Sequence, residues 1–161
     1  MSMFENDQFR WRETYFVLFD AAKRPNLKTV LKKLAALNNR FALTNPAAGD
    51  EGLFESLTVL APDDFAALDI CYVAGDEVRE QALELAKEIR SPECSRDDLA
   101  KIERLKRLDG RFDVLHFEQL VDSCGDDLDE MFDPSGLLVV LDALVELTDG
   151  IAVDPQAGAM L

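Results

Sequence analysis

Three residues have side chains that could take part in chemistry, and their positions could lie close together in a fold: Asp69, Cys71 and His116. A thiol beside an imidazole is the arrangement of a nucleophile and its general base. Cys71 and His116 both fall on predicted strands, so they could be neighbours in one sheet. Nothing in the adjacent sequence activates either group, and buried cysteine is a common core residue. We therefore expect no catalytic residues and retain the three as candidate ligand-site residues.

Asp69 interrupts an otherwise apolar strand, Leu68-Asp69-Ile70-Cys71-Tyr72. If that side of the strand is buried, the carboxylate needs a partner, and Arg40 or Arg111 could supply one. If that side reaches solvent, no partner is required. We favour the second interpretation, although a buried acid in a cleft would be a candidate functional residue.

The sequence predicts no metal site and no cofactor. Cys71, Cys94 and Cys124 are an odd number without a closely spaced pair, so neither a disulfide framework nor structural zinc is expected, even with His116 as a fourth ligand. The acidic segment 122–133 lacks the calcium-loop pattern, because Cys124 takes its third position and the glycine, Gly125, comes too early. A solvated acidic loop is the simpler interpretation. Phosphate-binding glycine loops are also missing from the sequence.

The chain carries a net charge of −15, and its last 50 residues hold 12 acidic residues with no lysine or arginine. Such a surface repels phosphate backbones and anionic lipids, so we expect neither nucleic-acid nor membrane binding. Solubility explains the charge most simply, and a basic protein partner is the alternative. The first residues are polar and no apolar run approaches the roughly 20 residues that span a bilayer, so we expect a cytoplasmic protein.

Hydrophobic periodicity predicts a single α+β domain over residues 1–161. The expected architecture is a mixed, mostly antiparallel sheet of five to six strands with helices packed mainly on one face. The predicted order is β-α-β-β-β-α-α-β-α-β, over residues 13–20, 26–37, 41–44, 53–60, 66–73, 76–90, 97–108, 111–120, 134–148 and 151–153.

The helix predicted over 134–148 is too apolar for the surface of a sheet. Between Leu137 and Leu147, nine of eleven residues are apolar, the exceptions being Asp142 and Glu146. Protein must cover most of this helix, either inside the subunit or from a second copy or partner. The residues that would form the partner or dimer surface are Leu137, Leu138, Val140, Leu141, Leu144 and Val145.

Three segments resemble those of uncharacterised conserved bacterial proteins of the planctomycete type. They are Phe54-Glu55-Ser56-Leu57-Thr58, Pro62-Asp63-Asp64-Phe65 and the run from Gly150 to Gly158, which contains Asp154-Pro155-Gln156-Ala157-Gly158. The resemblance implies a family of unknown function, and its motifs are structural turns. It assigns no catalytic residue.

The leading hypothesis from the sequence is a non-enzymatic bacterial domain that acts through contact with another protein or through self-association as a homodimer. The alternative is a small-molecule- or metal-binding domain, possibly a hydrolase, that uses Asp69, His116 and the acidic segment.

Overall fold

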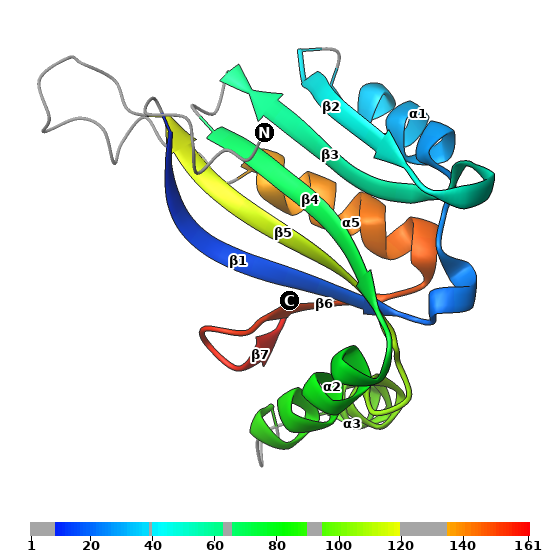
Figure 1. The fold of residues 1–161 in the computed structure, drawn as a ribbon. Helices are drawn as coiled ribbons and strands as arrows, with labels where there is room; N and C mark the ends of the chain where they lie inside the picture. Colours follow the sequence, from blue (N-terminus) through cyan, green and yellow to red (C-terminus); the bar gives the residue numbers. More distant parts are fainter. Residues whose placement is uncertain (1–8, 39, 63–65, 90–94, 120–134) are drawn as a thin grey trace, which may run out of the picture.

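The computed structural model describes residues 9–38, 40–62, 66–89, 95–119 and 135–161. These residues form one seven-stranded sheet in the order β2-β3-β4-β5-β1-β6-β7 (Figure 1). Every neighbouring pair of strands is antiparallel. The α+β class is therefore confirmed. The strands are β1 (Phe9–Phe19), β2 (Ala42–Ala48), β3 (Phe54–Ala61), β4 (Ala66–Ala74), β5 (Gly110–Gln119), β6 (Ile151–Asp154) and β7 (Ala159–Met160), and the helices are α1 (Leu27–Leu37), α2 (Asp76–Glu88), α3 (Arg96–Leu105) and α5 (Ser135–Thr148).

Strands β2, β3 and β4 form an antiparallel meander, and β2 is longer than the strand predicted over 41–44. The strand continues past Asn45 and Pro46 to Ala48 through a bulge, where Asn45 adopts a φ of 51°. Proline is tolerated here because β2 is the edge strand, so its missing N–H costs no hydrogen bond to a neighbour. This strand forms one border of the candidate site.

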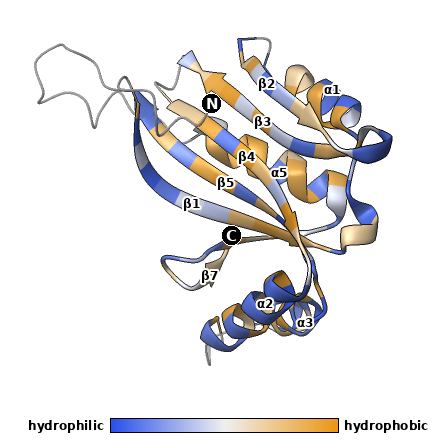
Figure 2. Ribbon diagram, viewed as in Figure 1, coloured by the Kyte–Doolittle hydropathy of each residue, from blue (hydrophilic) through white to orange (hydrophobic). Residues whose placement is uncertain are grey.

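The main core lies between the sheet and helices α1 and α5. Because successive side chains of a strand point to opposite faces, the central strands send alternate residues into this core. Figure 2 shows hydrophobic and polar residues alternating along these strands. The fully buried side chains of the main core include Val17, Phe19, Val30, Leu34, Phe54, Val59, Ile70, Phe112, Val114, Val140 and Leu144.

Helix α5 is covered inside the subunit, which corrects the predicted partner surface. Leu137, Val140, Leu141 and Leu144 are each at most 4% exposed and belong to the main core. Val145 is half-buried and packs against the same core. Of the six residues assigned to a partner surface, only Leu138 is largely exposed, at 50%. The apolar helix is thus explained by the sheet and by α1.

The distribution of the helices differs from the expectation that they pack mainly on one face. Helices α2 and α3 pack together with Leu18, Ile151 and Val153, whose side chains point away from α1 and α5. Strands β1 and β6 therefore carry apolar residues on both faces, with α5 packed against one face and the α2–α3 pair against the other. In Figure 1 the α2–α3 pair lies at one end of the sheet.

The C-terminal turn closes the sheet through side-chain hydrogen bonds. The side-chain amide of Gln156 accepts a hydrogen bond from the Thr14 N–H and donates one to the Thr14 C=O, both at 2.9 Å. The amide thereby makes the two hydrogen bonds to β1 that the backbone of a neighbouring strand would make, beyond the point where β6 ends. Asp154 Oδ1 accepts hydrogen bonds from the N–H groups of Gln156 and Ala157. In this chain, the Asp-Pro-Gln segment therefore has a structural role.

Replacing two leucines of α5 tests this arrangement. Leu144 is completely buried, so Leu144→Ala should lower the free energy of unfolding by about 2–5 kcal/mol. Leu138→Ala, on the exposed side of the same helix, should change it by only about 0.5 kcal/mol. Chemical denaturation measures both. Equal losses of unfolding free energy in the two variants would instead place α5 at an interface. The same conclusion would follow if the sedimentation coefficient fell on dilution for the parent protein but not for Leu138→Ala.

Candidate functional site

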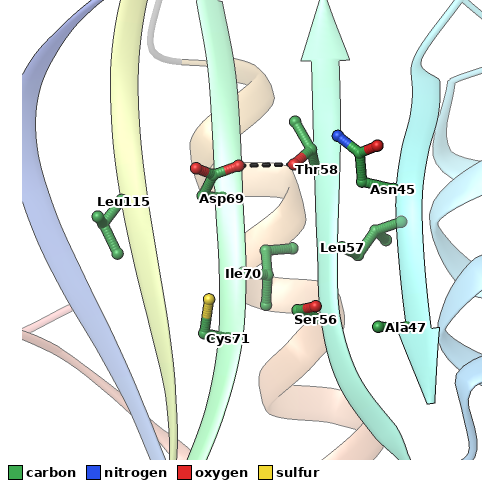
Figure 3. A pocket seen from close by; sticks show the side chains of 9 residues that line it. All are labelled: Asn45, Ala47, Ser56, Leu57, Thr58, Asp69, Ile70, Cys71 and Leu115. Carbon is green, nitrogen blue, oxygen red and sulfur yellow. Dashed lines mark hydrogen bonds between the residues drawn. The ribbon is translucent and has the colours of Figure 1, made fainter. Parts of the chain in front are cut away.

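A groove with a volume of about 430 Å³ lies on the face of the sheet opposite to α1 and α5. We call this side the groove face. The groove crosses β2, β3, β4 and β5 (Figure 3). Among the described residues it has a floor formed by the sheet and no covering helix. Its lining residues are Asn45, Ala47, Ser56, Leu57, Thr58, Asp69, Ile70, Cys71 and Leu115.

The hollow results from short side chains placed opposite one another on β3 and β4. Ser56 pairs with Cys71 in the register of the two strands, and Thr58 pairs with Asp69. Directly opposed residues in an antiparallel pair point to the same face. These four side chains therefore occupy the centre of the groove face, while Ile70, between two of them, packs into the main core.

Asp69 is only 9% exposed although Cys71, on the same side of β4, is exposed, so this side of the strand reaches solvent while the Asp69 carboxylate itself is buried and needs a partner. Its Oδ1 accepts a hydrogen bond of 2.6 Å from the hydroxyl of Thr58, which is itself 5% exposed. A hydrogen bond to a carboxylate is stronger than one between neutral groups, and it offsets part of the cost of burial. The carboxylate is thereby held in one orientation at the floor of the groove.

Arg111, one of the two predicted partners of Asp69, is bound elsewhere on the groove face. Its Nε lies 2.5 Å from Asp113 Oδ1, and its guanidinium also contacts Gln81 of α2. The guanidinium stacks on the ring of Phe16, with its central carbon 4.2 Å from the ring centroid. These contacts tie β5 to α2 and anchor the end of the sheet beside the groove.

Cys71 shares the groove with Asp69 and has an exposed side chain. Partial burial raises the pKa of its thiol, and the negative charges of Asp69 and Asp113 raise it further. A nucleophilic cysteine needs the opposite environment, because the thiolate is the reactive form. Cys71 is therefore held as a protonated thiol at neutral pH.

His116 lies on a strand beside Cys71 but on the other face of the sheet. It pairs with Leu68, whose side chain packs into the main core, and it is fully buried. Its Nδ1 lies 3.2 Å from Glu13 Oε1. Burial lowers the pKa of the imidazole, and the contact with Glu13 partly offsets this effect. Cys71 and His116 therefore do not form a nucleophile–base pair, since the sheet separates them.

The sequence identified Asp69 and Cys71 as site residues and missed their neighbours. Asn45 lies on β2, Ser56 and Thr58 lie on β3, and none of the three belongs to a recognisable motif. The available signal was the alternation in β3, where Ser56 and Thr58 are polar and Leu57 and Val59, which follow each of them, are apolar. Assigning these residues to the side of Asp69 requires the strand register.

Within the described parts of the chain, no cluster of histidine, cysteine, aspartate or glutamate could hold a metal ion. The acidic segment 122–133 lies outside the described residues. No helix in the described ranges combines the length and apolar character required to span a membrane. Comparisons with protein-family models, curated proteins and solved structures each found no match. The resemblance to a bacterial family therefore stays a prediction.

The hydrogen bond between Thr58 and Asp69 can be tested with two substitutions of Thr58. Thr58→Val removes a donor from a buried carboxylate while preserving the shape of the side chain. It should lower the free energy of unfolding by about 1–3 kcal/mol at neutral pH. Thr58→Ser keeps the hydroxyl and should retain more of that stability than the valine variant. Urea denaturation distinguishes them, and equal losses would show that the hydroxyl contributes nothing.

The lowered pKa of His116 predicts how stability depends on pH. The unfolded chain binds the proton near the ordinary pKa of 6.5, whereas the folded chain binds it only at lower pH. The free energy of unfolding should therefore fall as the pH drops below about 6.5. His116→Gln, which cannot titrate, should lack this component when denaturation is compared at pH 7.5 and 5.5.

NMR gives a direct check, because the chain contains one histidine and its imidazole signals need no further assignment. The folded protein should titrate below pH 6.5. A midpoint at or above that value would contradict the burial of a neutral imidazole.

Proposed function

We propose that this protein is a non-catalytic binding domain that acts through contact with another protein, and that the groove face is the contact surface. One observation carries the proposal: a groove of about 430 Å³ whose floor contains a buried, hydrogen-bonded carboxylate. Such a feature offers a partner both shape and one fixed polar contact. The free thiol at Cys71 fits the reducing cytoplasm, where we place the protein as part of this proposal.

The shape of the groove favours a protein partner over a compact small molecule. The lining runs across four strands, from Asn45 on β2 to Leu115 on β5, which corresponds to roughly 14 Å at the usual strand spacing. Small-molecule sites enclose most of their ligand's surface. A sheet face that provides only a floor cannot do so, whereas a partner protein would cover the groove with its own surface.

The chemistry of the groove favours binding over catalysis. The thiol of Cys71 has a raised pKa, and His116 lies on the far side of the sheet. A hydrolase built from Asp69 and His116, the alternative from the sequence, would need both groups at one site. Their separation removes the support for that mechanism.

The same structure weakens the case for a homodimer through α5, since four of the six assigned residues pack in the core. Two copies with a net charge of −15 each also repel one another. A different protein that carries positive charge at its contact surface is favoured on both grounds.

The proposal can be tested by selecting phage-displayed random peptides against the protein and against two variants. Ser56→Phe fills the centre of the groove, and Ala100→Phe adds the same ring at an exposed position of α3. We expect peptides that bind the parent and Ala100→Phe and that lose most of their affinity for Ser56→Phe. Circular dichroism verifies that both variants fold.

Peptides that bind all three proteins equally, or a failure to enrich any peptide, would contradict the proposed contact surface. A third outcome would redefine the site. If a metabolite raises the melting temperature of the parent and not that of Ser56→Phe, the groove binds a small molecule and the proposal of a protein partner is wrong.

A further inference from the structure

We propose that the groove receives a positively charged side chain of the partner, the ammonium of a lysine or the guanidinium of an arginine, with Asp69 as its counter-charge. This inference rests on the proposed function and deepens it by naming the chemical class of the group that enters the groove. It depends on the position of the carboxylate, on the polarity of the lining and on the charge of the surrounding face.

Asp69 is placed to act as the counter-charge because its carboxylate lines the groove and is held by Thr58. The side chain is nine-tenths buried and its Oδ1 accepts the Thr58 hydroxyl. A fixed carboxylate in a partly desolvated hollow attracts a cation more strongly than one on a mobile, exposed side chain does.

The other polar lining residues can accept hydrogen bonds from a cation, and none of them carries a positive charge that would attract an anion. Asn45, Ser56 and Thr58 contribute oxygen atoms that can accept hydrogen bonds, and none of the nine lining residues is lysine or arginine. The arginine on the same face, Arg111, is engaged by Asp113 and by the side chain of Gln81. Ammonium and guanidinium groups donate hydrogen bonds and accept none, so both match a lining that is rich in hydrogen-bond acceptors.

Cys71 shows that the negative charge extends across the groove. Burial is the largest cause of the raised pKa of its thiol, and Asp69 and Asp113 are the next two. These carboxylates disfavour the thiolate because they already make the potential negative at the sulfur atom. The same potential favours a cation in that position. Cys71 is therefore a natural reporter for the charge preference of the groove.

The test compares how fast Cys71 reacts with two thiol reagents of opposite charge. The probes are trimethylammonioethyl methanethiosulfonate, a cation, and sulfonatoethyl methanethiosulfonate, an anion. The full chain is used with Cys94 and Cys124 replaced by serine. After correction for the reaction of each reagent with 2-mercaptoethanol, we expect Cys71 to favour the cation severalfold. High salt should reduce this preference.

Asp69→Asn keeps an acceptor for Thr58 and removes the charge, so it should lower the preference for the cationic reagent. Glu84→Gln removes the same charge from an exposed position of α2 that does not line the groove, and it should leave the preference unchanged. An equal preference in the parent and Asp69→Asn, or a preference for the anion, would overturn the inference.

A second measurement separates this inference from the proposed function. Peptides selected on the parent should contain lysine or arginine, and their alanine variants should bind more weakly to the parent but not to Asp69→Asn. Peptides that depend on an open groove yet lack a basic residue would support the protein-binding function and overturn the cation assignment. Peptides that are basic but indifferent to Ser56→Phe would contradict the proposed contact surface itself.

Discussion

The packing of α5 against one face of the sheet is the contact on which the rest of the structure depends. Its buried side chains, among them Val140 and Leu144, meet the apolar residues of the central strands and of α1. At roughly 1.5–3 kcal/mol for each fully buried aliphatic or aromatic side chain, this layer is the largest source of stability in the fold. One face of the sheet thus supplies most of the core, and the opposite face of β3 and β4 is free to carry polar residues.

Alternation along each strand then determines where chemistry can occur. In β4, Leu68 and Ile70 enter the core, so Asp69 and Cys71 must point to the groove face. In β5 the same constraint sends His116 into the core side, where it is buried beside Glu13. Cys71 and His116, although on neighbouring strands, therefore lie in different environments, one in the groove and the other buried on the core side. The pKa shifts of Cys71 and His116 follow from these environments.

The sequence predicted the elements well because each depends on local periodicity. It predicted that α5 must be covered by protein, since the width of an apolar helix face is visible in the sequence. It could not show that the cover comes from the same subunit, because that depends on how α1 and the sheet are placed. For the candidate site, adjacency of the Cys71 and His116 strands was a correct expectation. The sequence could not predict that the two side chains lie on opposite faces of the sheet. That depends on the strand register, which pairs His116 with Leu68.

The groove carries a stability cost that the rest of the fold must offset. Ser56 and Cys71 sit opposite each other in the middle of a sheet, where larger β-branched side chains would fill the hollow and bury more apolar area. Nearby on the same face, Ala67 and Phe117 are completely buried, so apolar packing is compatible with this side of the sheet. A hollow lined by short polar side chains beside such packing lowers the stability of the sheet, and the proposed binding role gives a reason for it.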